Sequence, residues 1–206
     1  EENKVYPREI FGLDKVTSFG YSSAGSEMIF SGVVEGQSDL YRYYLIGNRQ
    51  FKLTDDVYDD HDPRFINGDS RVIFSSTRPN DTLFVALDEN PVMVNKDIFI
   101  IDLDGSSVLE RITATSERNE QSPFAYDSLR YTYLADQDLI YDRYIAAYDS
   151  VISRIDTTIH YRYFTNEFRL TSYRTNPIEY HFDSKQSDYS LLQYRDGHYR
   201  FLKGSL

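Results

Sequence analysis

Short apolar and aromatic runs alternate along the whole chain with clusters of Asp, Asn, Gly, Ser and Pro. The runs are rich in Val, Ile, Tyr and Phe, which favour β-strands. We predict seven strands, at residues 27–34, 39–46, 71–76, 97–103, 129–135, 160–164 and 189–194. Tight turns are predicted by four dipeptides that accept positive φ, namely Gly47-Asn48, Asn67-Gly68, Asp104-Gly105 and Asp196-Gly197.

One segment has a competing helical period. In residues 138–148 five apolar side chains would share one face of a helix, namely Leu139, Ile140, Tyr144, Ile145 and Tyr148. We favour a strand there because the segment falls inside a repeat of strands.

The repeat is marked by an apolar residue followed by threonine at the end of a strand. Residues 51–54 (FKLT), 110–113 (ERIT) and 168–171 (FRLT) align at nearly equal intervals. Each is followed by a polar loop and a proline, and residues 8–11 (REIF) open the chain in the same order. Four units are visible, of which the first and the last are incomplete.

Repeated units of four short antiparallel strands are typical of the blades of a β-propeller. Because neighbouring blades cover both faces of such a sheet, apolar and polar residues need not alternate along its strands. This explains the continuous apolar run at residues 97–101. The period exceeds the ~40–45 residues of a typical blade. The surplus lies at residues 79–95 in one unit and 150–163 in the next, which predicts insertions on different ends of the propeller.

We therefore predict an all-β fold, with residues 1–206 forming a single β-propeller domain or a propeller fragment. Residues 5–11 read as an outermost strand without a blade, and residues 178–182, 189–194 and 198–202 supply three strands without a fourth. A propeller of four blades closed by the N-terminal strand would satisfy both ends. Part of a larger propeller is the alternative, and the Glu-Glu start favours it because it is not a natural initiation.

The second unit contains a series of short motifs in a fixed order. They are L-T, an acidic loop, P-x-F, an N-G turn, a strand ending in S-T-R and a D-I-F strand, seen as LTDD, DPRF, NGDS, FSSTR and KDIF. In this order the unit resembles the TolB-like, WD-related propeller repeat. Residues 140–176 are similar to a segment of large envelope proteins of Gram-negative bacteria. The resemblance implies a periplasmic or outer-membrane-associated location, and the lack of tryptophan after the prolines departs from the family pattern.

Aspartates gather just before the strand at residues 71–76, at Asp55, Asp56, Asp59, Asp60 and Asp62. A calcium loop needs alternating oxygen ligands and a distal glutamate, which this run does not supply. We interpret the run as a polar connection between blades, with a metal site as the alternative. Residues 102–105 (DLDG) read as a hairpin turn in the same way, and we expect no metal and no cofactor.

The composition restricts the function further. With 22 basic and 33 acidic residues the net charge is -11, which argues against nucleic acid as a partner. Cysteine is absent, the four histidines lack metal-ligand spacing, and no nucleophile elbow or phosphate-binding glycine loop is present. No apolar run is long enough to cross a bilayer.

We therefore expect no enzymatic activity, and a non-catalytic binding and scaffolding module of a bacterial cell-envelope protein. The expected partners are a protein or peptide of basic or polar character and other domains of a longer chain. The alternatives are the gating propeller of a prolyl-oligopeptidase-type serine peptidase and, more distantly, a metal-dependent lyase of acidic sugars. The candidate partner-binding residues lie between blades, at Asp55, Asp56, Asp59, Asp60, His61, Arg78, Glu117 and Arg118.

Overall fold

The computed structural model describes residues 7–81, 83, 95–106 and 108–205, and these residues form strands and no helix. Consistently, none of them forms a helix able to span a membrane. The strands are β1 (Lys15–Tyr21), β2 (Glu27–Val34), β3 (Gln37–Tyr44), β4 (Arg49–Lys52), β5 (Asp60–Ile66), β6 (Arg71–Ser76), β7 (Asp97–Asp102), β8 (Leu109–Arg111), β9 (Glu120–Ala125), β10 (Arg130–Gln137), β11 (Ile140–Ile155), β12 (Ile159–Arg169), β13 (Pro177–Asp183), β14 (Asp188–Arg195) and β15 (His198–Ser205).

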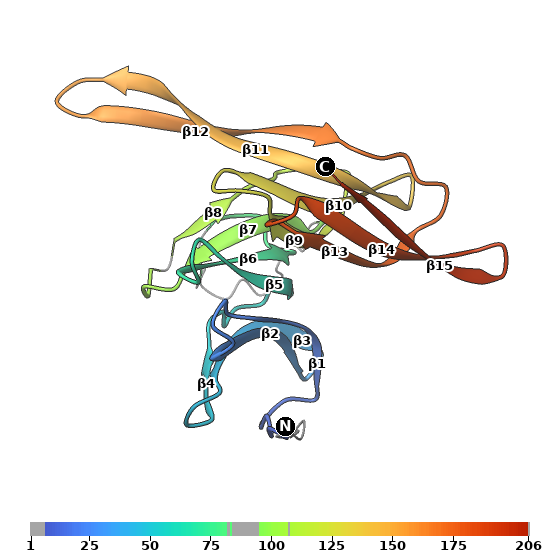
Figure 1. The fold of residues 1–206 in the computed structure, drawn as a ribbon. Helices are drawn as coiled ribbons and strands as arrows, with labels where there is room; N and C mark the ends of the chain where they lie inside the picture. The colour runs from blue at the N-terminus through green and yellow to red at the C-terminus, as the bar shows by residue number, and fades with distance from the viewer. Residues whose placement is uncertain (1–6, 82, 84–94, 107, 206) are drawn as a thin grey trace.

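Consecutive strands pair antiparallel into four sheets. They are blade 1 (β1–β4), blade 2 (β5–β8), blade 3 (β9–β12) and blade 4 (β13–β15). The first strands of successive blades are in contact, β1 with β5, β5 with β9 and β9 with β13, so the blades follow one another around a common axis (Figure 1). The predicted all-β propeller architecture is confirmed.

The seven strands first predicted are confirmed, but residues 7–11, the described part of the strand predicted at 5–11, form no strand. The helical alternative for residues 138–148 is wrong, because β11 continues the sheet of blade 3. The predicted turns also occur. Asn67 and Gly68 have φ of 50° and 65°, and Asp196 and Gly197 have 53° and 80°, the left-handed values that such two-residue turns require.

Apolar side chains fill the space between neighbouring blades. Ile29 and Leu40 of blade 1 pack with Val72, Phe74 and Phe99 of blade 2, and all five are completely buried. A second cluster joins blades 2 and 3, and a third joins blades 3 and 4. Each internal sheet is thus covered on both faces, as the continuous apolar runs predicted.

The repeated threonines lock the fourth strand of each blade to the third. The hydroxyls of Thr54, Thr113 and Thr171 accept the backbone N–H of Leu40, Ile98 and Arg143 at 2.9, 2.8 and 2.9 Å. The residue before each threonine donates its own N–H to the carbonyl of the same third-strand residue, at 2.8 Å in all three blades. The aligned motif therefore forms the same hydrogen-bonded junction between third and fourth strands in all three blades.

An ion pair between a buried aspartate and a more exposed cation accompanies each lock. The third strand carries a buried aspartate, and the fourth strand supplies a cation that pairs with it. The pairs are Asp39–Lys52 at 2.9 Å, Asp97–Arg111 and Asp142–Arg169.

The insertion predicted at residues 150–163 extends the β11–β12 hairpin far beyond the other strands (Figure 1). The insertion predicted at residues 79–95 falls largely outside the described residues. Its described ends follow β6 and precede β7, the second and third strands of blade 2, whereas the hairpin tip joins the third and fourth strands of blade 3.

The two chain ends differ from prediction. Blade 1 has all four strands, so the first unit is complete. Residues 7–11 lie beside blade 1, where Gln50 and Phe11 meet, and β15 pairs with β14 alone among the described strands. Closure of four blades by the N-terminal strand of the same chain is therefore wrong for the described part of that strand, which lies far from the last blade (Figure 1).

Candidate functional site

The structure places seven of the eight candidate residues in or next to two inter-blade connections, whereas Arg78 lies within blade 2, between β6 and β7. Asp55, Asp56 and Asp59 lie between β4 and β5, but Asp60 and His61 already belong to β5. The remaining three are Arg78, which follows β6, and Glu117 and Arg118, which lie between β8 and β9. Each connection is shorter than predicted, because an inner strand begins within it.

Arg78 and Asp60 are completely buried. The Arg78 guanidinium donates to both Asp60 carboxyl oxygens, at 2.8 and 2.7 Å, and to Asp56 at 3.0 Å. Burial raises the pKa of Asp60, and the charge of Arg78 acts in the opposite direction. This cluster joins the first connection to blade 2, and its burial removes Asp60 and Arg78 from any surface that a partner could touch.

The other residues of the first connection are more accessible. Asp55 is exposed and pairs with Lys52, while Asp59 accepts the backbone N–H of Ser38 at 2.9 Å. His61 is partly buried, and burial together with the charge of Lys96 lowers its pKa. These contacts order the connection, as expected for polar residues between blades.

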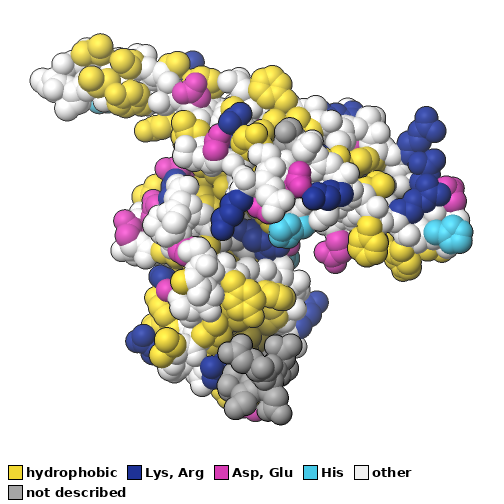
Figure 2. Space-filling model, in the orientation of Figure 1, with side chains coloured by type: hydrophobic (Ala, Val, Ile, Leu, Met, Phe, Trp, Pro, Cys, Tyr) yellow, Lys and Arg dark blue, Asp and Glu magenta, His cyan; other side chains and the backbone are white. Residues whose placement is uncertain are grey.

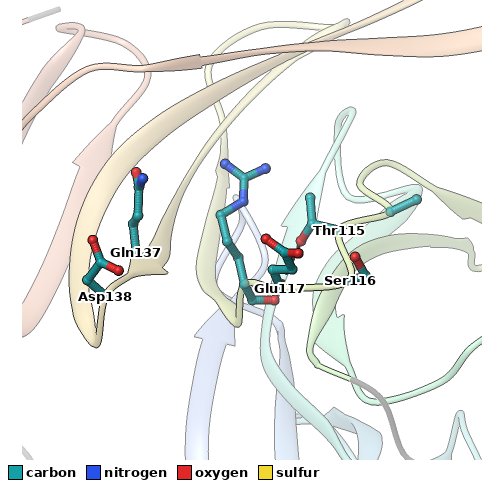
Figure 3. A pocket seen from close by; sticks show the side chains of 7 residues that line it. Thr115, Ser116, Glu117, Gln137 and Asp138 are labelled. Atoms are coloured by element: carbon teal, nitrogen blue, oxygen red, sulfur yellow. Dashed lines mark hydrogen bonds between the residues drawn. The ribbon is translucent and has the colours of Figure 1, made fainter.

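The second connection forms one wall of a cavity of about 500 Å³. Thr115, Ser116 and Glu117 lie on one side, and Gln137 and Asp138, at the turn between β10 and β11, lie on the other (Figure 3). Asp138 and the next residue have φ of 54° and 67°, so the chain reverses tightly and presents the aspartate at its tip.

Arg118 forms the back of this cavity. Its guanidinium pairs with Glu167 of β12 and stacks over the Tyr144 ring, with 4.8 Å to the ring centroid. The arginine is thereby fixed between blade 3 and the connection. Its charge is already balanced by Glu167, so it does not neutralise the exposed carboxylates at the rim.

Glu120, the first residue of β9, is buried beneath this cavity. The hydroxyls of Thr113 and Thr115 donate to its two carboxyl oxygens, the latter at 3.0 Å. Burial raises the pKa of Glu120 to about 8, and the charges of Asp97 and Glu167 act in the same direction. Asp60, which begins β5, pairs with Arg78 at 2.7 Å, whereas the arginine nearest to Glu120 among its described ion pairs, Arg118, lies at 4.0 Å.

A second cavity of about 350 Å³ lies on the axis and is lined by the first strands of all four blades. Arg64 enters it from β5, donates to the carbonyl of Phe19 at 2.9 Å and stacks over Phe124, with 5.1 Å to the ring centroid. His181 of β13 lies against the same ring. Burial lowers the pKa of Arg64.

The acidic connections group no set of metal ligands in the part of the chain that the structure describes. Among residues 7–81, 83, 95–106 and 108–205, no three His, Asp or Glu side chains are grouped so that they could hold a metal ion. The observed partners of the aspartates are backbone N–H groups, Lys52 and Arg78.

The sequence did not single out Asp138, Gln137 or Glu120. Asp138 stood within the segment with competing helical periodicity, so its turn could not be recognised. Glu120 had an available signal, because it precedes the aligned Pro123 by the same three residues that separate Asp60 from Pro63.

Comparisons with known proteins identify the fold of the chain. No protein-family model and no curated protein matches the chain. Its structure is similar to TolB from Acinetobacter baumannii, with 16% identity and a TM-score of 0.61 over 94% of this chain and 41% of that one. It is also similar to a putative TolB from Agrobacterium tumefaciens, with 15% identity and a TM-score of 0.67 over 97% of this chain and 64% of that one.

A third similar structure is the tricorn protease, with 13% identity and a TM-score of 0.55 over 92% of this chain and 23% of that one. The chain thus spans less than two thirds of the length of each of these proteins. At such identities the likeness concerns the fold. The chain has a β-propeller fold similar to that of the two TolB structures.

Proposed function

We propose that this propeller is a non-catalytic binding and scaffolding module of a bacterial cell-envelope protein, in the periplasm or at the outer membrane. It engages a basic or polar segment of a protein partner. The TolB-like fold supports the propeller role, and the net charge of -11 supports the charge of the partner.

The cavity between the second connection and the β10–β11 turn is the observation on which the proposal rests. Glu117 and Asp138 lie exposed at its rim, and neither forms an ion pair with another described residue. Two unbalanced carboxylates beside a cavity of about 500 Å³ suit a lysine or arginine side chain with its flanking backbone.

The topology supports a broader surface at the same end. Strands alternate in direction within a blade, so inter-blade connections and the turns between second and third strands share one end of the propeller. Asp55, Asp59 and Glu35 join Glu117 and Asp138 at that end. Loops on a rigid scaffold commonly carry binding function.

A peptide-binding titration tests the proposal. Fluorescence anisotropy is measured with a Lys- and Arg-rich peptide and with a Glu-rich peptide of the same length. We expect binding of the basic peptide only, weakening as salt rises, and a loss of affinity of about tenfold or more in Glu117→Lys and Asp138→Lys.

Asp104→Lys is the matched control, because it makes the same charge change at an exposed turn on the opposite end. Equal loss in the control, or affinity insensitive to salt, would contradict the proposed surface.

The gating propeller of a serine peptidase remains the second candidate, and similarity to the tricorn protease favours it. The two differ in what accompanies the module in the full gene product. A hydrolase domain encoded in the same reading frame would support the peptidase.

A further inference from the structure

Arg64 enters the cavity of about 350 Å³ on the axis, here called the axial cavity, without an acidic partner. Its Nη1 donates to the backbone carbonyls of Phe19 and Pro63, at 2.9 Å each. The charges of Asp62 and Glu179 act on Arg64, but neither carboxylate forms an ion pair with it, and no other described residue does. Because a guanidinium stays charged in a protein, its charge is left for a ligand to balance.

The same two hydrogen bonds fix the orientation of the guanidinium. Both use Nη1, whereas Nε and Nη2 of Arg64 donate to no described residue. These two nitrogens form one edge of the planar group, and such an edge binds both oxygens of a carboxylate at once. The Phe124 ring supports the group, and Gly20 lets the stem pass closely, since a Cβ there would lie 3.4 Å from the Arg64 Cδ. The free edge is therefore held in place before a ligand binds.

The axial cavity adds a second polar group and apolar walls. His181 lies against the Phe124 ring, with 5.4 Å between the ring centroids, and an imidazole has an N–H donor in either neutral form. Phe19, Phe65 and Ala125 contribute to the apolar walls. A few polar groups among apolar walls in a cavity of this size are typical of a site for a small ligand or a side chain.

The axial cavity lies at the end of the propeller opposite to the inter-blade connections. Its residues come from the C-terminal ends of the first strands β1, β5, β9 and β13, whereas the connections lead into the N-terminal ends of these strands. Figure 2 shows Lys or Arg and His side chains in the middle of the view, over the region where β5, β9 and β13 lie in Figure 1. The axial cavity is therefore separate from the cavity beside Glu117.

The charge of the whole chain restricts the ligand further. The net charge of -11 repels a ligand with several negative charges, such as a nucleic acid. One guanidinium edge matches a single carboxylate, and the apolar walls match an apolar group attached to it.

We propose that the axial cavity binds a carboxylate that is joined to an apolar group. Nε and Nη2 of Arg64 donate to the two carboxylate oxygens, and the apolar group packs against Phe19 and Phe124. Two sources share this chemistry, namely the C-terminus of a peptide and an acidic side chain beside an apolar one. The site is independent of the basic segment proposed to bind near Glu117, because it lies at the other end and takes a ligand of opposite charge.

Isothermal titration calorimetry of the 206-residue chain tests the site with three short N-acetylated peptides. The first ends in phenylalanine with a free carboxylate and has no acidic side chain. The second is the same peptide with an amidated end, and the third is amidated and carries one glutamate beside a phenylalanine. We expect saturable binding of the first or the third peptide and none of the second. Binding of the first alone identifies chain ends as the source of the carboxylate, and binding of the third alone identifies acidic side chains.

Substitutions connect the binding to Arg64. Arg64→Lys keeps the charge but replaces the two-nitrogen edge by a single ammonium group, and it should weaken the affinity about tenfold. Arg64→Met removes the charge as well and should weaken the affinity further. Arg130→Lys is the matched control, because it makes the same change at an exposed arginine at the start of β10, outside the axial cavity, and it should leave the affinity unchanged.

The Nε–H group of Arg64 gives a second measurement that uses the wild type. In proton–nitrogen correlation spectra its signal, assigned by its loss in Arg64→Lys, should shift when the binding peptide is added. The variants should keep the β-sheet circular dichroism signal of the wild type. Failure of both carboxylate peptides to bind would overturn the proposal, as would equal binding of the second peptide or binding that leaves the Arg64 signal unchanged.

Discussion

Replacing Glu120 by glutamine should change how the stability of the protein depends on pH. The pKa of this buried carboxyl is about 8 in the folded protein, against an ordinary value of 4.5. The folded state therefore binds the proton more tightly than the unfolded state between these values. The corresponding stability is fully present below about pH 4.5 and is lost as pH rises through about 8.

The size of the effect follows from the two pKa values. Each pH unit between them corresponds to about 1.4 kcal/mol, so the free energy of unfolding falls by up to about 5 kcal/mol over the whole titration. Glutamine has the shape of the protonated acid and no charge at any pH. It should keep a hydrogen bond with Thr113 while removing this part of the pH dependence.

Urea unfolding followed by circular dichroism provides the assay, at pH values from about 5 to about 9 that bracket the titration. The informative quantity is the difference in the free energy of unfolding between wild type and Glu120→Gln at each pH. Burial raises the pKa of Asp39 to about 6, but Asp39 contributes equally to both proteins and cancels in this difference. Glu117→Gln is the control, since that exposed acid lies in the same connection. Parallel pH profiles for wild type and Glu120→Gln would refute the reasoning.

Three further substitutions test the fold by the same urea measurement. Arg78→Met leaves Asp60 buried without its partner and should cost about 3–5 kcal/mol, whereas a loss under about 1 kcal/mol would mean that the ion cluster stabilises little. Thr113→Val removes the hydroxyl that accepts the Ile98 N–H and should cost about 1–3 kcal/mol, and no change would argue against the lock. Gly32→Ala places a methyl group 2.8 Å from the nearest side-chain carbon and should cost about 1–3 kcal/mol, unless that side chain moves aside.

The repeat and its strands could be predicted because they depend on local chemistry. An apolar residue plus threonine ends each fourth strand, and the structure gives that pattern one hydrogen-bonding role in three blades. The burial of Arg78 could not be read from the sequence, because it depends on how Tyr58, Phe74 and Phe99 converge around one guanidinium. In the sequence alone, a buried arginine cannot be told from an exposed one until these strands and the connection before β5 are placed.

Only one of the two walls of the cavity beside Glu117 could be predicted from the sequence. Its inter-blade wall was expected from polar composition, but the opposite wall depends on where the β10–β11 turn falls. That position is set by the pairing of Gln137 with Ile140 across the sheet. The register of this hairpin depends on which face of each strand is buried, so composition alone does not determine it.

Because the β11–β12 hairpin is long, its outer half should open locally more often than its inner half. Near Tyr144 the strands are part of the core. From the pair Ser150↔Tyr163 to the pair Ile155↔Ile159, each strand pairs only with the other. Amide hydrogens of the outer half should therefore exchange with solvent water while those of the inner half stay protected. A protease cut at Arg154 would leave both strands attached to blade 3, so the arm can be shortened without unfolding the propeller.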